Sequence, residues 1–340
     1  MNYYAAPMEG LTDRIWRQAH QRWFGAPEAP VRYYAPFLSP PENRVLIKKK
    51  MAELEPAANP GVQVIPQLLA KDGELAAWMI GELRRIGYTE VNLNFGCPSG
   101  TVTAKGKGSG MLRDPQKLDA FLDAVFSQAG GPVSVKTRLG VARAEEFGEI
   151  LNVYNKYPLC ELIIHPRVMK QLYRGQADRE AFAACLPACT APVCYNGDLF
   201  SVSDTERFLV EYPDADDLMF GRGMLIDPAL VMRLRAKSAD PAKKNAAKKL
   251  RLENKSTVWE DAAKRVSDIR DFYGRLAEDY AAVLSGERDV LFKMKELWSW
   301  QGQLFEGSEK YLKKIRKAQK LTEYKSAVAA LFADCPIKDA

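Results

Sequence analysis

Eight short apolar runs, each bounded by turn-forming residues, divide the first two thirds of this chain into similar segments. Stretches with helical spacing lie between the runs, most clearly at residues 74–88 and 114–130. The runs begin roughly every 25 to 45 residues, which is about the length of one strand–helix unit. An open doubly wound sheet would have fewer strands, so the count favours a (β/α)₈ TIM barrel within the α/β class. The runs are residues 2–8, 33–38, 64–69, 90–96, 133–140, 161–167, 192–198 and 217–223.

The alternation of strand and helix patterns stops after residue 236. A polar segment follows, and the remaining residues carry sustained helical periodicity. We therefore predict a barrel domain at 1–236, a basic linker at 237–256 and an all-α domain of about four helices at 257–340.

The excess of basic over acidic residues lies entirely in this last third. Of the net charge of +6, residues 1–236 contribute nothing, with 27 basic and 27 acidic side chains. Residues 237–320 hold 20 Lys and Arg against 13 Asp and Glu. Such a local excess favours a polyanionic partner, although solvated helix faces alone also produce it.

Several protein classes are disfavoured by what the sequence lacks. It has neither an apolar run of 18 residues nor a secretory signal pattern, so we expect a cytoplasmic protein without a membrane span. With two histidines and no C-x-x-C pair among the six cysteines, we expect no metal site. Five of the cysteines are interpreted as small apolar filler in a reducing compartment. Nothing indicates an obligate protein partner.

Polar residues cluster where the predicted strands end, the position of functional groups in TIM barrels. Lys136 lies within an otherwise apolar strand, where a lysine is costly unless it meets an anion or a polar ligand atom. The NGD sequence at 196–198 and the GRG sequence at 221–223 follow the last two strands, where these barrels often bind phosphate. A snorkelling lysine and two tight turns remain the alternatives, but a phosphorylated cofactor explains all three features.

The glycine-rich stretch 103–111 is not a nucleotide-binding P-loop. Gly108 stands where that motif requires Ser or Thr, and five residues rather than four separate Gly100 from Gly106. We interpret it as a mobile loop beside the active site. No G-x-G-x-x-G follows a predicted strand, so a separate Rossmann domain is not expected.

The strand-end motifs, taken in order, resemble those of the tRNA-dihydrouridine synthases, most closely a bacterial branch with the cysteine motif LN-x-GCPS. The resemblance covers about residues 1–230, and the helical tail matches the family's RNA-binding domain in position and character. The motifs are APMEGLTD, PQLL, VNLNFGCPS, VKTRLG, H-x-R, YNGD and FGRG.

The resemblance implies reduction of the C5–C6 double bond of specific uridines in tRNA by FMN, which NADPH reduces. Hydride goes to C6 of the uracil, and C5 then needs a proton. A thiol with an ordinary pKa of ~8.5 is mostly protonated in the cell, which suits Cys97 as the general acid.

The family pattern also implies roles for further residues of this chain. Val168 is a departure, because many relatives have threonine there. The implied cofactor-binding residues are Pro7, Met8 and Glu9 along the flavin ring, Gln67 near it, Lys136 at its N1–C2 edge, His165 near the phosphate, and Asn196, Gly197, Asp198, Gly221 and Arg222 at the phosphate and ribityl end. The implied substrate contacts are Asn94, Arg138 and Arg167.

Two other functions remain open on the sequence alone. A flavin barrel acting on a free pyrimidine, like a dihydroorotate or dihydropyrimidine dehydrogenase, would share the chemistry but would not need the basic helical tail. A non-catalytic RNA-binding protein would not need Cys97, Lys136 and the Gly-Arg-Gly sequence together.

The charge distribution generates a first prediction. If the basic helical region binds RNA phosphates, affinity for tRNA should fall steeply as salt concentration rises, because bound phosphates release counterions. Binding isotherms at increasing ionic strength measure this, and a flat response would contradict it.

Overall fold

The computed structural model describes residues 1–26, 30–215, 217–238 and 262–338. Most of the predicted linker at 237–256 therefore lies outside the described residues. By its internal contacts the chain divides into two compact units. The first unit is Met1–Arg14, Val31–Asp198 and Phe208–Gly221, and the second is Ile15–Pro30, Leu199–Arg207 and Arg222–Ala340.

Among the described residues, nine strands form one sheet in the first unit, and every predicted apolar run overlaps at least one of them. The third run contains two strands, because Pro66 between them has no backbone N–H to donate to the ladder. The strands are β1 (Asn2–Ala5), β2 (Arg32–Tyr34), β3 (Gln63–Ile65), β4 (Gln67–Leu68), β5 (Val91–Phe95), β6 (Val133–Gly140), β7 (Glu161–Val168), β8 (Val193–Tyr195) and β9 (Asp217–Phe220).

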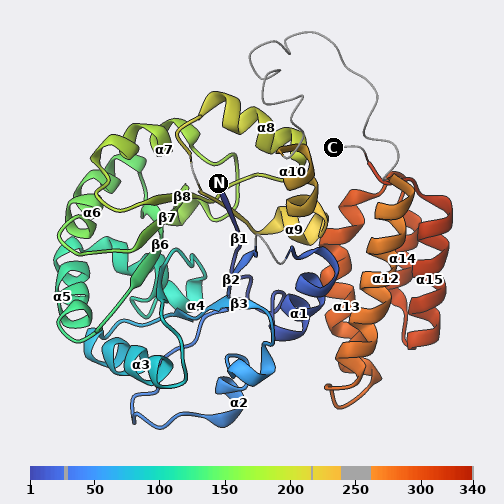
Figure 1. Cartoon of the computed structure of the whole chain (residues 1–340), viewed down its shortest axis with the longest axis horizontal. Helices are drawn as coiled ribbons and strands as arrows, with labels where there is room; N and C mark the ends of the chain where they lie inside the picture. The colour runs from blue at the N-terminus through green and yellow to red at the C-terminus, as the bar shows by residue number, and fades with distance from the viewer. Residues whose placement is uncertain (27–29, 216, 239–261, 339–340) are drawn as a thin grey trace. The chain divides into compact units, whose positions relative to one another are not determined.

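The sheet closes into a barrel, which the spacing of the runs could not establish. All strand pairs are parallel, and the order is β3-β2-β1-β9-β8-β7-β6-β5-β4. The first strand pairs with the last, from Asn2 opposite Asp217 to Ala5 opposite Phe220. At the other end of the order, β3 runs through Pro66 into β4, which completes the ring (Figure 1). The predicted TIM-barrel architecture is confirmed.

Helices outside the ring cover the strands, and their ends follow from local sequence signals. Asp72 caps α3 by accepting from the Leu75 N–H at 2.9 Å. Asp114 caps α5 in the same way, and Pro115 occupies its first helical position. The helices that lie wholly in this unit are α2 (Lys48–Met51), α3 (Gly73–Arg85), α4 (Gly100–Thr103), α5 (Pro115–Phe126), α6 (Phe147–Tyr154) and α7 (Arg179–Cys185).

The four predicted helices of the C-terminal region are confirmed and belong to the second unit. They are α12 (Ala262–Ala281), α13 (Glu287–Gln301), α14 (Glu309–Lys317) and α15 (Leu321–Asp334). Buried Asp227 ties α12 to the preceding α10 (Leu230–Ser238), because its Oδ2 accepts from Arg265 and from Arg233, each at 2.9 Å. This unit also contains α9 (Arg222–Ile226) and most of α1 (Arg14–Phe24), while α8 (Val202–Glu211) runs through both units. Among the described helices, none is both long and apolar enough to cross a membrane.

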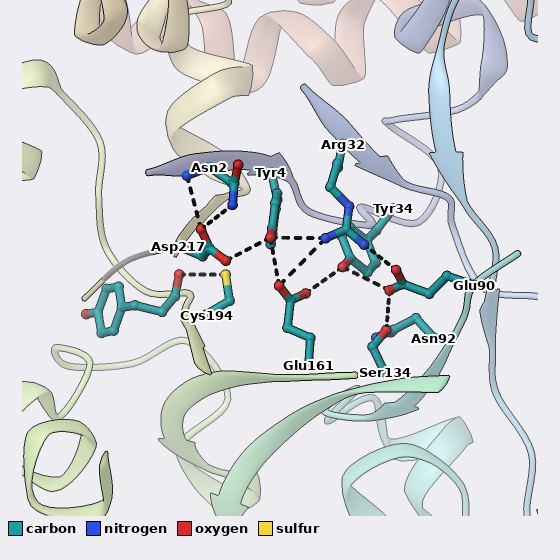
Figure 2. A network of polar contacts seen from close by, with 11 residues as sticks. Asn2, Tyr4, Arg32, Tyr34, Glu90, Asn92, Ser134, Glu161, Cys194 and Asp217 are labelled. Atoms are coloured by element: carbon teal, nitrogen blue, oxygen red, sulfur yellow. Dashed lines mark hydrogen bonds and ion pairs between the residues drawn. The ribbon is translucent and has the colours of Figure 1, made fainter. Parts of the chain in front are cut away.

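A network of polar side chains fills the barrel at the amino ends of its strands (Figure 2). The buried carboxylate of Glu161 accepts from the hydroxyls of Tyr4 and Tyr34, each at 2.7 Å. The guanidinium of Arg32 pairs with Glu90 and lies 3.7 Å from Glu161. These hydrogen bonds and ion pairs replace the contacts that the carboxylate would make with water, and so they offset the free-energy cost of burying it. We interpret this end as the stability face of the barrel.

The network generates a stability prediction. The substitution Tyr34→Phe removes a hydrogen bond to the buried Glu161 carboxylate and should lower the free energy of unfolding by about 1.5–3 kcal/mol. Urea denaturation measures the change. Tyr212→Phe is the matched control, since the Tyr212 hydroxyl bonds only the neighbouring Glu211 carboxylate at an exposed position. Equal effects of the two substitutions would contradict our interpretation of the network.

Candidate active site at the carboxyl ends of the strands

The turn that follows β5 presents Cys97 at the carboxyl end of the barrel. The side chain of Asn94, on β5, accepts from the backbone N–H groups of Gly96 at 3.0 Å and of Cys97 at 2.9 Å. The Asn94 amide thus holds the backbone of the turn, while the Cys97 thiol is free of a disulfide and half-buried.

The glycine-rich loop packs against this turn. The Cys97 carbonyl accepts from both the backbone N–H and the hydroxyl of Ser109, at 3.0 and 2.9 Å. Gly108 has a φ of +55°, and a Cβ atom there would lie 2.7 Å from the Cys97 carbonyl oxygen. Gly110 likewise lies close to the Thr103 backbone. Close backbone packing is therefore a sufficient reason for these two glycines, and mobility of the loop stays a prediction.

Burial raises the pKa of the Cys97 thiol above its ordinary value. The nearby carboxylate of Glu9 acts in the same direction, while Arg138 and Lys136 oppose it. A raised pKa means that the thiol keeps its proton throughout the neutral range. The group is thereby suited to donate a proton rather than to attack as a thiolate.

Lys136, on β6, lies opposite Asn94 in the sheet register. Its ammonium makes no hydrogen bond or ion pair with the part of the chain that the structure describes. Burial, and then the positive charge of Arg138, lower its pKa to about 8. A cation without a protein partner, pointing with Asn94 to the same face of the sheet, fits an anionic or electron-rich ligand atom.

Arg138 is buried two residues further along β6, and its guanidinium bonds backbone carbonyls. It donates to Gly96 at 3.0 Å, to Val168 at 2.9 Å and to Leu172 at 2.7 Å. Burial lowers its pKa to about 10. Arg138 therefore holds together the loops after β5 and β7. The sequence predicted a substrate contact for Arg138 and not this structural role.

His165 and Arg167, on β7, form a buried cluster with Asp198, which follows β8. The guanidinium of Arg167 makes a two-pronged pair with Asp198, at 3.1 and 2.5 Å, and donates to Nε2 of His165 at 3.0 Å. Because a guanidinium only donates, His165 accepts through Nε2 and carries its ring hydrogen on Nδ1. The cluster joins Arg167, for which a substrate contact was predicted, to His165 and Asp198, which were both predicted to bind the cofactor.

Of the remaining predicted cofactor residues of the first unit, Gln67 lies on β4 and the others follow β1, β8 and β9. A Cβ atom on Gly221 would lie 3.2 Å from the Met8 sulfur, so glycine permits a close approach of two strand ends. Asn196 donates to the Met219 carbonyl at 2.8 Å, and Gly197 packs closely against neighbouring side chains. Pro7 and Met8 are half-buried and Glu9 is exposed. Arg222 belongs to the second unit, where its guanidinium lies 4.9 Å from the centre of the Phe200 ring.

Two features of the site were missed by reasoning from sequence. Tyr173, in the loop after β7, is half exposed, and its ring lies 5.2 Å from the Arg138 guanidinium carbon and 6.1 Å from the His165 ring. Its only signal in the sequence is a tyrosine eight residues after the strand-end histidine.

The second missed feature is a group of lysines on α2 and on loops of the barrel unit. The ammonium of Lys107 donates to Ser39 at 3.4 Å. Burial lowers its pKa, and the nearby charges of Lys105, Lys71 and Lys50 lower it further. The zero net charge of residues 1–236 concealed this local excess. No group of three or more potential metal-binding side chains occurs in the described residues.

The chain is similar in sequence to one protein family along most of its length. The family model described as Dihydrouridine synthase (Dus) matches residues 4–328. The chain is 33% identical over 235 residues to a probable tRNA-dihydrouridine synthase 1 of Synechocystis sp., covering 66% of this chain and 62% of that protein. It is 29% identical over 222 residues to tRNA-dihydrouridine synthase B of Pseudomonas putida, covering 65% and 64%. A tRNA-dihydrouridine(16) synthase of Cupriavidus necator is 29% identical over 235 residues, covering 68% and 73%.

The match thus spans less than two thirds of the length of the first two relatives. Among solved structures, a complex of 2-naphthoyl-CoA reductase with 2-naphthoyl-CoA superposes with a TM-score of 0.52 at 12% identity, over 69% of this chain and 50% of that one. At this identity the likeness concerns the fold alone.

The raised pKa of Cys97 generates a prediction about its reactivity. Alkylation by iodoacetamide requires the thiolate, so the reaction at Cys97 should have its pH midpoint above that of the same cysteine in the urea-unfolded protein. Peptide mass spectrometry after timed alkylation at several pH values measures both midpoints. A folded-state midpoint at or below the unfolded one would contradict a protonated thiol.

Proposed function

Because the chain belongs to the dihydrouridine synthase (Dus) family, we propose that it reduces uridines of tRNA to 5,6-dihydrouridine, with Cys97 as the proton donor. Family membership confirms the resemblance that the strand-end motifs indicated. The observation that carries the proposed reaction is the Cys97 turn. A half-buried thiol with a raised pKa follows β5, and the neighbouring strand β6 carries Lys136, whose ammonium has no partner among the described residues.

The residues at the carboxyl ends of the strands fit FMN as the cofactor. Lys136 supplies a cation that has no hydrogen-bond or ion-pair partner among the described residues. When bound, FMN reduced by NADPH supplies the hydride that C6 of the uracil receives. Lys136 would hold the N1–C2 edge of the ring, and Asn196 and Gly221 would lie at the ribityl and phosphate end. Arg222 as a phosphate ligand stays a prediction.

Cys97 completes the reduction of the base. Addition of hydride at C6 of uracil leaves negative charge on C5 and on the C4 carbonyl, so C5 needs a proton from a positioned acid. The Cys97 sulfur holds that proton at neutral pH because burial raises its pKa. The turn that carries it is held from two sides, by Asn94 through the amides and by Ser109 through the carbonyl. Such support keeps a catalytic group at a defined place.

Lys136 supplies the positive charge that would stabilise a reduced, anionic cofactor. Its pKa of about 8 leaves the ammonium mostly protonated at neutral pH and close to losing its proton in slightly alkaline solution. An anionic ligand group nearby would raise that pKa, since an opposite charge favours the protonated form. The lysine would therefore stabilise negative charge at the cofactor when it is reduced.

The RNA would be held by the phosphate backbone, with the target base turned out of its stack. Lys50, Lys71, Lys105 and Lys107 supply positive charge on the barrel unit, in addition to the C-terminal helices. Tyr173 offers an exposed aromatic ring on which a base can stack, beside the Arg138 guanidinium. These lysines also weigh against a free pyrimidine as the substrate, because a small base would not need them.

The proposed role of Cys97 predicts the behaviour of a substitution. Cys97→Ala should retain bound flavin and tRNA affinity but form dihydrouridine about 10²–10⁴-fold more slowly, the usual cost of losing a general acid. Single-turnover reduction of an unmodified tRNA transcript with NADPH, followed by nucleoside mass spectrometry, measures the rate.

Cys160→Ala is the matched control, because Cys160 precedes β7 at the opposite end of the strands. It should reduce the transcript at the wild-type rate. Undiminished activity of Cys97→Ala would exclude Cys97 as the donor, and a wild-type protein that binds no flavin would overturn the proposed function itself.

A further inference from the structure

A continuous row of polar side chains leads through the barrel interior to the Cys97 turn. We call Glu90, Ser134, Asn92, Gln67 and Asn94 the polar row. In the sheet register, Gln67 on β4 lies opposite Asn92 on β5, which lies opposite Ser134 on β6. Alternate residues of a strand point to the same face, so Asn92 and Asn94 share the interior side of β5.

Each member of the polar row bonds the next at a short distance. Asn94 Nδ2 donates to Gln67 Oε1 at 2.8 Å, and Gln67 Nε2 donates to Asn92 Oδ1 at 2.8 Å. Asn92 Nδ2 donates to the Ser134 hydroxyl at 2.9 Å, and this hydroxyl donates to Glu90 Oε1 at 2.7 Å. Figure 2 shows Asn92, Ser134 and Glu90 at the edge of the network around Arg32.

The carboxylate of Glu90 determines the direction in which the whole row donates. A carboxylate accepts only, so Ser134 must give it the hydroxyl hydrogen and accept from Asn92. Asn92 then presents its oxygen to Gln67, which in turn must present its own oxygen to Asn94. Only one orientation of each side-chain amide lets it donate to one neighbour and accept from the next. At the end of the row, this orientation turns the Asn94 oxygen toward the N–H groups of Gly96 and Cys97.

A barrel interior does not need such a row for stability. Gln67, Asn92 and Ser134 have no solvent exposure, and a buried amide costs free energy unless all of its hydrogen bonds are made. Apolar side chains of similar shape would fill the same space, as they do where Ile65, Ile163 and Met219 meet in the barrel core. The row therefore indicates a requirement for orientation rather than for packing.

We propose that Ser134 and Asn92 are positioning residues, which act through Gln67 and Asn94 to hold the backbone of the Cys97 turn in place. Neither residue touches the reacting groups in this proposal. Its consequence for catalysis rests on the proposed function, but its consequence for the turn does not.

The test uses the full-length protein carrying Ser134→Ala. This substitution removes the acceptor of the Asn92 amide and the donor to Glu90, so the amides of the row lose their defined direction. Hydrogen exchange of the peptide containing Gly96 and Cys97 should become about tenfold faster, as expected when one supporting hydrogen bond is lost. The pH midpoint of Cys97 alkylation should shift as well. With tRNA and NADPH, kcat should fall about tenfold while KM for the tRNA stays unchanged.

Two further variants separate positioning from general destabilisation. Ser134→Thr keeps the hydroxyl and should restore exchange and alkylation to the wild-type values. Thr137→Val removes a buried hydroxyl from the same strand, one that bonds Tyr154 and points to the other face of the sheet. It should lower stability without changing exchange at the Cys97 turn. If Ser134→Ala does not fold, the similarly shaped Asn92→Leu tests the same row.

The outcomes distinguish this inference from the proposed function. Faster exchange and a shifted alkylation midpoint in Ser134→Ala, but not in Thr137→Val, support the inference even if the wild-type protein reduces no tRNA. Exchange and alkylation in Ser134→Ala that match those of Thr137→Val overturn it, whatever the catalytic activity.

Discussion

The parallel pairing of β1 with β9 is the constraint on which the rest of this structure depends. It joins the first strand of the chain to one more than 210 residues later, and it leaves the sheet without an open edge. Because all strands run in the same direction, closure brings their carboxyl ends to one end of the barrel. Motifs as distant as APMEGLTD and FGRG meet there, as the close approach of Gly221 to Met8 demonstrates.

Charged side chains lie at both ends of the barrel interior, but they have different partners at the two ends. At the amino ends, Arg32, Glu90 and Glu161 are compensated by one another and by tyrosine hydroxyls. At the carboxyl ends, Arg138 donates to backbone carbonyls through two of its guanidinium nitrogens, while Lys136 has no partner within the described residues. An uncompensated buried cation is costly, and this cost supports the proposal that Lys136 binds a ligand.

Several residues that resemble ligand contacts of the family have structural partners in this chain. Arg138 holds the loops after β5 and β7, and the pair of Arg167 with Asp198 joins the end of β7 to the loop after β8. Together with the polar row, these contacts make the surroundings of Cys97 a supported framework. A framework of this kind places a proton donor at a defined position and limits the reorganisation needed during the reaction.

The sequence by itself determined the number of strand–helix units, the four C-terminal helices and the family, because these depend on local periodicity and on short motifs. Lys136 stood out for the same reason, as a charge within an apolar strand. Only the tertiary structure decided that the sheet closes, that Pro66 divides one run into two strands, and that Ser134 and Asn92 lead to the Cys97 turn. It also brought Lys50, Lys71 and Lys105 within electrostatic range of Lys107. These features depend on strand register and loop packing, which act between residues far apart in the chain and leave no local pattern in the sequence.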